Sequence, residues 1–279
     1  MAGYHIAALK NRIIYKRLPW TASQKKLGKF WTKGKKTTRN NLSNRKMDSH
    51  TDILQNPVVN SIGFTEKALA FFEGHINSYK YRGGAVGLEF LYHNPLNNVK
   101  AHSICFNGET INRIKGEQDT LALIVLSKQD IRLASSVYIF NCPVEALSYL
   151  SLKDGLRGYE ALVVFPKTFK TEHVDVVKTM FPKSRPICSF GKGQLAALQD
   201  AQFLLAYTGK AGEIKISQGF DGIEVKNGKG KTREYDYFSM RNLIIDFYRK
   251  HYDLGPKTLK PLKYYDSFLH QLCKRKQLH

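Results

Sequence analysis

The sequence predicts an α/β protein with a mainly parallel sheet flanked by helices, a small β-rich segment before it, and basic N- and C-terminal arms. The first indication is that short apolar runs alternate with helical patterns from residue 135 onwards, as in parallel strands joined by crossover helices. The second is a set of short apolar runs separated by turn sequences between residues 85 and 127. The third is the positive charge, which is concentrated at the two ends of the chain.

The alternating part of the chain holds three strand–helix pairs. Each strand is a compact run of β-branched and aromatic residues, and each following helix carries periodic apolar residues. Pro143 suits the first turn of the first helix, where a backbone N–H would have no partner. The predicted strands are residues 135–140, 160–165 and 185–190, and the helices are 142–152, 171–181 and 194–210. Further strands are predicted at 213–217 and 222–225, and a helix at 235–252.

The chain before residue 130 is predicted to form a helix followed by short strands. Thr65 precedes an apolar-periodic run that ends at Gly83-Gly84, which predicts a helix over residues 64–83. The predicted strands are residues 85–92, 101–106 and 121–126. We expect four regions: a basic arm (1–52), a small helix-plus-β segment (53–130), an α/β domain (131–248) and a basic C-terminal tail (249–279).

The formal net charge is +21, and most of it lies near the chain ends. Residues 1–50 hold 13 Lys and Arg against one acid, and residues 249–279 hold eight against two. Clustered cations of this kind are attracted to nucleic acid through the release of condensed counterions. We expect nucleic acid as a partner, DNA in preference to RNA, together with other proteins of a nucleoprotein complex and no membrane. Charge that serves solubility alone is the simpler alternative.

Two aromatic residues of the N-terminal arm, Phe30 and Trp31, lie between lysines. Rings in this setting can stack on bases while the cations hold phosphates, or they can pin the arm to the body; the sequence leaves both open. The residues that we expect to bind nucleic acid are Lys25, Lys26, Lys29, Phe30, Trp31, Lys33, Lys35, Lys36 and Arg39 in the arm, Lys167 and Lys192 at strand ends, and Lys274, Arg275 and Lys276 in the tail.

Cysteine usage and hydropathy bear on the compartment. The four cysteines are widely spaced without a CxxC pair, which favours reduced structural thiols over a zinc site. The sequence has no run of 18 apolar residues, so no membrane span is predicted. We expect a bacterial cytoplasmic protein, although the basic, acid-free N-terminus also resembles a mitochondrial presequence.

The most informative short stretch is Gly191-Lys192-Gly193, which joins a predicted strand to a predicted helix. Glycines and a lysine before a helix are suitable for binding a phosphate, because the first backbone N–H groups of a helix attract anions. The full P-loop pattern GxxxxGK[ST] is absent, however, so a nucleotide site is weakly supported. A nucleic-acid phosphate at this turn stays open.

Two segments carry a resemblance to a known family. VYIFNCPVEALSYLSL (137–152) and ICSFGKGQLAALQDAQFLLA (187–206) resemble the two motifs of Toprim domains, which occur in DnaG-type primases, topoisomerases and related nucleases. The stretch 85–120 looks like the small β segment that precedes Toprim in proteins of plasmids and other mobile elements. The resemblance covers roughly residues 85–225, and its first motif matches better than its second.

The resemblance places the family's catalytic positions on residues that cannot do its chemistry. The catalytic Glu position falls on Asn141, and the two metal-binding Asp positions fall on Gly191 and Gly193, while the acid near the start of the first helix is retained as Glu145. Mg²⁺ requires carboxylate oxygens, and phosphoryl transfer requires the metal. We therefore expect no metal, no cofactor and no catalytic residue, and interpret the turn as a Toprim loop that has lost its acids.

Three functional hypotheses follow. The first is an inactive Toprim-like, primase-like protein that binds nucleic acid in the replication, transfer or integration of a plasmid or other mobile element. The second is a divergent metal-dependent nuclease or primase that uses Glu145 and Asp200 instead. The third is a structural subunit of a larger ribonucleoprotein assembly, in which basic arms become ordered on binding.

Overall fold

The chain divides into two units, Met1–Asn44 and Arg45–His279. The computed structural model describes residues 50–81, 84, 86–95, 100–114, 121–166, 171–207, 209, 214–218, 223–227, 230–235 and 257–278, all of which belong to the second unit. The predicted nucleic-acid-binding residues between Lys25 and Arg39, together with Lys167, lie outside the described residues. So does most of the predicted helix at 235–252.

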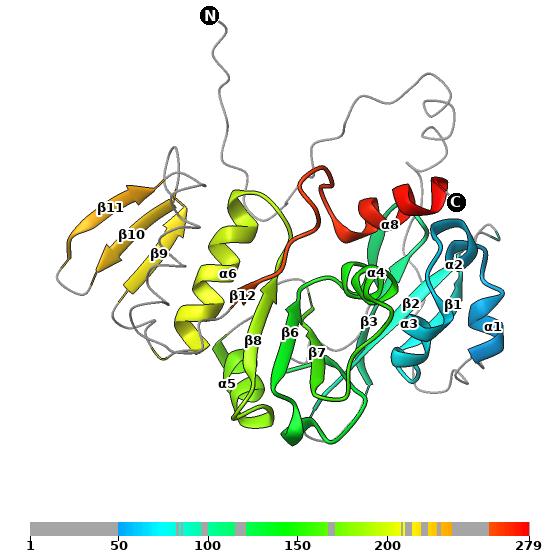
Figure 1. Cartoon of the computed structure of the whole chain (residues 1–279), viewed down its shortest axis with the longest axis horizontal. Coiled ribbons are helices and arrows are strands. Elements are labelled where there is room, and N and C mark those ends of the chain that lie inside the picture. Colours follow the sequence, from blue (N-terminus) through cyan, green and yellow to red (C-terminus); the bar gives the residue numbers. More distant parts are fainter. Residues whose placement is uncertain are drawn as a thin grey trace, which may run out of the picture. The chain divides into compact units, whose positions relative to one another are not determined.

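The centre of the fold is a five-stranded sheet with strand order β12-β8-β6-β7-β5 (Figure 1). Its strands are β5 (Ile124–Ser127), β6 (Ser136–Phe140), β7 (Glu160–Val164), β8 (Arg185–Ser189) and β12 (Lys257–Thr258). The four strands from β12 to β7 are parallel, and β5 runs antiparallel to β7. The predicted α/β class and mainly parallel sheet are therefore confirmed.

Helices cover both faces of this sheet, and this coverage buries its strands on both sides. The helices α4 (Pro143–Lys153), α5 (Thr171–Met180) and α6 (Gln194–Tyr207) follow β6, β7 and β8. Tyr138 and Phe140 belong to the core cluster that includes residues of α4. Their neighbours Val137 and Ile139 belong to the cluster that includes residues of α5 and α6. The alternation of side chains along β6 thus separates the two cores.

A second sheet is antiparallel and comes from the segment before residue 115. Its strands, in the order β1-β2-β3-β4, are β1 (Ile76–Lys80), β2 (Val86–His93), β3 (Lys100–Phe106) and β4 (Ile111–Ile114). Three short helices precede it: α1 (His50–Leu54), α2 (Pro57–Ile62) and α3 (Glu66–Phe71). The predicted small β-rich segment is therefore present.

The predicted helix over residues 64–83 is wrong in its second half. α3 begins after its N-cap Thr65, as predicted, but ends at Phe71. Gly74 then adopts a φ of 81°, which favours glycine and breaks the helix. Residues Ile76–Lys80 pair along β2 instead, so that Ile76 lies opposite Phe90 in the core.

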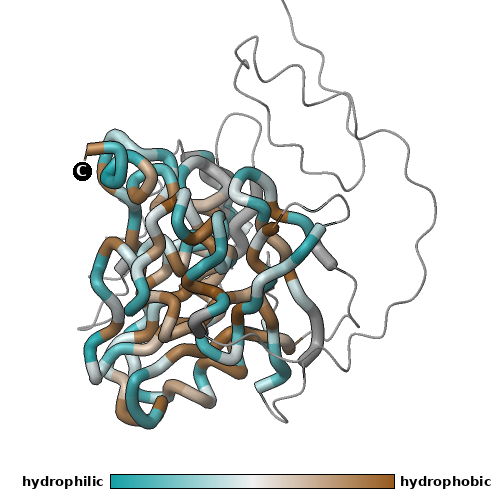
Figure 2. Tube along the Cα trace, turned by 90° about the vertical axis from the view of Figure 1, so that its right-hand side faces the viewer, coloured by the Kyte–Doolittle hydropathy of each residue, from teal (hydrophilic) through white to brown (hydrophobic). Residues whose placement is uncertain are grey.

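The predicted division at residue 130 does not separate two cores. β5 comes from the upstream side of that position and forms the edge of the main sheet beside β7. Leu88 and Phe90 of β2 share one buried cluster with Leu147 and Leu150 of α4. Figure 2 shows the hydrophobic stretches concentrated inside the body and hydrophilic stretches around the C-terminus.

A third, antiparallel sheet of the order β11-β10-β9 contains β9 (Ile214–Gln218), β10 (Ile223–Asn227) and β11 (Thr232–Tyr235). The strands predicted at 213–217 and 222–225 exist, but they pair with each other and not with the parallel strands. Among the described residues, none of the helices has the length and apolar character that crossing a membrane requires.

The C-terminal residues are part of the folded body. The prediction of a basic tail over residues 249–279 needs correction for residues 257–278, which form β12 and the helix α8 (Phe268–Gln277). β12 pairs with β8, and α8 packs on α4 through the buried residues Phe268 and Leu272 (Figure 1).

Candidate functional site

The carboxyl edge of the main sheet brings together the segments 137–152 and 187–206, on which the predicted site rests. β6 and β8 are parallel neighbours, and Phe140 lies opposite Ser189. Asn141 and the turn Gly191–Gly193 therefore leave the sheet side by side, at the edge where open α/β sheets usually bind ligands. The proximity that the resemblance implies for these positions is present. We call this edge the candidate site.

The two glycines of the turn have a conformational reason to be glycine. Gly191 has a φ of 101° and Gly193 a φ of 94°, which is a region that residues with a side chain rarely adopt. A Cβ atom at Gly193 would meet nothing within 4 Å, so backbone conformation and not space accounts for this residue. Asn141, directly after β6, donates a hydrogen bond from its side-chain amide to Oε1 of Gln199 on α6 at 3.0 Å.

A buried ion pair lies directly beneath the turn. Asp200 of α6 is almost fully buried, and its carboxylate accepts from the Nζ of Lys260. The same ammonium group donates to the carbonyl oxygen of Gly191 at 2.6 Å, and the backbone N–H of Phe190 donates to Oδ1 of Asp200 at 3.4 Å. Burial raises the pKa of Asp200, and the positive charge of Lys260 offsets this only in part.

Strand pairing explains how Lys260 reaches the candidate site. β12 runs parallel to β8 with Thr258 beside Cys188, and the N–H of Leu259 donates to the carbonyl oxygen of Cys188 at 2.8 Å. The residue that follows therefore emerges at the same edge as the turn. Sequence reasoning missed Lys260, because a two-residue strand carries no periodic pattern of its own.

The lysine of the turn, Lys192, contacts the segment that leads into α8. The Nζ of Lys192 donates to the carbonyl oxygens of Leu262 at 3.0 Å and Lys263 at 3.1 Å, and also to that of Tyr265. An ammonium group has three donors, so the chain itself occupies all of them. In this structure Lys192 orders the segment before α8, and its predicted contact with a nucleic-acid phosphate stays a prediction.

The acid near the start of α4, Glu145, also has a structural role. It lies in the first turn of α4, and its Oε2 accepts from the backbone N–H of Phe268, the first residue of α8, at 2.7 Å. The carboxylate thus lies at the N-termini of two helices, where the helix dipoles favour a negative charge. Burial nevertheless raises the pKa of Glu145, against the effect of the N–H groups of Phe268 and Leu269.

The three basic residues of α8 are exposed. Lys274 donates to Oε1 of Gln277 at 3.1 Å, and Lys276 donates to the carbonyl oxygen of Asn60, which ties α8 to α2. Together with Arg275 they form the last turn of α8, where cations interact favourably with the helix dipole. The three residues of the C-terminal segment that we expect to bind nucleic acid are therefore at the surface.

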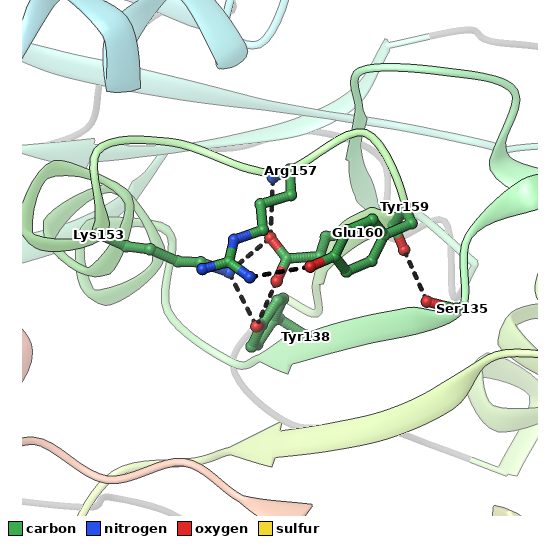
Figure 3. A network of polar contacts seen from close by, with 6 residues as sticks. All are labelled: Ser135, Tyr138, Lys153, Arg157, Tyr159 and Glu160. Atoms are coloured by element: carbon green, nitrogen blue, oxygen red, sulfur yellow. Dashed lines mark hydrogen bonds and ion pairs between the residues drawn. The ribbon is translucent and has the colours of Figure 1, made fainter.

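A second polar cluster lies near the amino ends of β6 and β7 (Figure 3). The carboxylate of Glu160 accepts from Nζ of Lys153 at 2.6 Å, from Oη of Tyr138 at 2.9 Å and from the backbone N–H of Arg157 at 2.8 Å. Burial by itself raises the pKa of Glu160, but these hydrogen bonds outweigh it and lower the pKa. The cluster fixes the turn between α4 and β7, so we interpret it as structural.

Comparison with known proteins leaves the candidate site to be interpreted from its own chemistry. No protein-family model and no curated protein matches the chain. Over the described residues, no group of three or more His, Cys, Asp and Glu side chains lies close enough together to hold a metal ion. Within the described part of the chain, the charged groups at the candidate site include Lys192, Lys260, Asp200 and Glu145, each of which contacts another part of the chain.

Proposed function

We propose that the chain is a nucleic-acid-binding, catalytically inactive Toprim-like protein that acts as an accessory or structural component of a nucleoprotein complex. The proposed setting is the replication, transfer or integration of a mobile element in the bacterial cytoplasm. DNA is favoured over RNA as the bound polymer, and other proteins of the complex are expected partners. This setting rests on the sequence resemblance.

The observation that carries the binding function is the charge of the N-terminal arm. Residues 1–50 hold thirteen cationic residues against one acid. This density of positive charge is typical of segments that neutralise phosphates. The basic residues Lys274, Arg275 and Lys276 add exposed cations on the body. Binding of this kind depends little on the nucleotide sequence, because the protein contacts the phosphate backbone and not the bases.

The contacts of the candidate site support the absence of catalysis. An ammonium group of the chain, that of Lys260, lies on the carboxylate of Asp200. The carboxylate of Glu145 accepts from the N-terminus of α8. Both acids on which a displaced metal site would depend are thus held by internal donors, and phosphoryl transfer needs carboxylates that face a metal and a substrate.

Replacing six lysines of the arm with glutamine in the full-length chain is expected to weaken binding to DNA at least tenfold near physiological salt. The residues to replace are Lys25, Lys26, Lys29, Lys33, Lys35 and Lys36. The logarithm of the binding constant falls linearly with the logarithm of salt concentration, and each lost phosphate contact makes this slope less steep by about 0.9. Fluorescence anisotropy with labelled single-stranded and duplex DNA and RNA at several salt concentrations measures both quantities.

The matched control replaces six exposed lysines of the body, namely Lys80, Lys128, Lys178, Lys183, Lys226 and Lys231. The control variant loses the same formal charge, so it is expected to bind more weakly than the natural chain but more tightly than the arm variant. Equal affinities and equal salt slopes for the two variants would show that the arm has no special role.

Incubation with labelled single-stranded and duplex substrates and either Mg²⁺ or Mn²⁺ is expected to give neither cleavage nor primer synthesis. Glu145→Gln separates this outcome from the enzyme hypothesis, because it removes the charge but keeps the shape of the side chain. Metal-dependent activity that disappears in Glu145→Gln, in a variant with an unchanged circular dichroism spectrum, would establish the divergent enzyme in place of our proposal.

A further inference from the structure

The segment between the candidate site and α8 exposes two large apolar side chains. Tyr264 is 86% exposed and Leu262 is 62% exposed, and Lys263 between them is also at the surface. The other aromatic residues nearby are partly or fully covered: Tyr265 is half-buried against His270, and Phe268 belongs to the core. Tyr264 is therefore the aromatic ring of this segment that a ligand can reach.

The chain holds this exposed segment in place. Lys192 binds three of its carbonyl oxygens, the N–H of Leu262 donates to Oε1 of Gln271 at 3.1 Å, and the N–H of Tyr265 donates to the carbonyl oxygen of Leu262 at 3.0 Å. The preceding residue, Pro261, is buried. A side chain on a backbone that is already ordered loses less entropy when it binds a partner.

The surroundings of Tyr264 favour a polyanion. Residues 257–279 contain six Lys and Arg against the one acid Asp266; of the six, Lys260 is paired with Asp200, and the exposed Lys263 directly adjoins Tyr264 in sequence. A flat ring beside an ammonium group can stack on a base while the cation binds the adjacent phosphate. A base in a duplex is already stacked on its neighbours, so a surface ring of this kind binds unpaired bases.

We propose that Tyr264 is a base-stacking residue for single-stranded nucleic acid, with Leu262 beside the same base and Lys263 on its backbone. The inference rests on the proposed function and extends it to a substrate class and to a place on the body. It places a contact with nucleic acid at the carboxyl edge of the main sheet, where the acids of the Toprim motifs are absent from this chain.

Tyr264→Ala in the full-length chain is expected to weaken binding to a single-stranded 20-nucleotide probe by about tenfold. Tyr264→Trp should retain the natural affinity, because indole also stacks. Binding to the matched duplex should stay unchanged, and so should the salt slope, because stacking neutralises no phosphate. Anisotropy titrations at one fixed salt concentration measure the affinities, and a salt series measures the slope.

The matched control is Tyr159→Ala. Tyr159 is a half-exposed tyrosine directly before β7, at the opposite edge of the main sheet, and its replacement should leave both affinities unchanged. If the natural chain binds with a steep salt slope but Tyr264→Ala binds the single strand equally well, the stacking inference fails while the proposed function stands. An equal loss on the single strand and the duplex overturns the inference too. Absence of salt-dependent binding by the natural chain overturns the proposed function itself.

Discussion

Replacing Lys260 with methionine is expected to lower the free energy of unfolding by about 3–5 kcal/mol, because it leaves a buried carboxylate without its charged partner. The side chain of Asp200 is 2% exposed, and the Lys260 ammonium is the cation that it contacts in the structure. Methionine keeps most of the length of lysine and can fill the same space, so the loss reports the charge and not a cavity. Urea unfolding followed by circular dichroism measures the change.

Two further variants make this test specific. Lys260→Met combined with Asp200→Asn removes both charges, so it is expected to recover much of the lost stability. Lys67→Met breaks a pair with Asp154 that has the same chemistry but is exposed, with an Nζ–Oδ2 distance of 2.5 Å, and should cost at most about 1 kcal/mol. If Lys260→Met and Lys67→Met cost the same, then Lys260 does not reach Asp200 in solution.

Replacing Phe268 with alanine is expected to lower the free energy of unfolding by about 3–5 kcal/mol, the usual cost of removing a buried aromatic side chain. Phe268 is 4% exposed, and its ring centroid lies 5.3 Å from that of Tyr149 and 6.2 Å from that of Phe140. The contact joins α8 to α4 and the main sheet. Thermal and urea unfolding of the variant measure the loss.

The control for this variant is the exposed aromatic residue four positions earlier. Tyr264→Ala should change the free energy of unfolding by no more than about 0.5 kcal/mol, because the ring has few neighbours to lose. If residues 257–278 did not pack on the body, Phe268→Ala and Tyr264→Ala would have equal free energies of unfolding. That result would restore the expectation that the C-terminal residues form an arm.

Local patterns account for the parts of the fold that were predicted correctly. The runs that form β6, β7 and β8 are compact and apolar because each strand is buried on both faces, and this makes them visible without knowledge of their neighbours. The alternation with helices restricts the order of connection to a parallel sheet. The position of the candidate site followed, because parallel strands place their carboxyl ends at one edge.

Long-range contacts account for the parts that were missed. Residues 76–80 have no strand pattern strong enough to compete with the helical periodicity before them, and pairing with β2 decides their structure. β12 has two residues, and its place beside β8 follows from hydrogen bonds made across about seventy residues of sequence. No local signal specifies such a pairing, because every residue except proline carries the same backbone donor and acceptor.

By itself, the sequence determined the α/β class and the concentration of charge at the ends, since periodicity and composition are properties of nearby residues. The tertiary structure alone decided what the charged side chains of the candidate site do. Lys192, Lys260 and Glu145 each bind a segment remote in sequence, and a side chain's partner depends on which distant residues the fold brings within hydrogen-bonding distance.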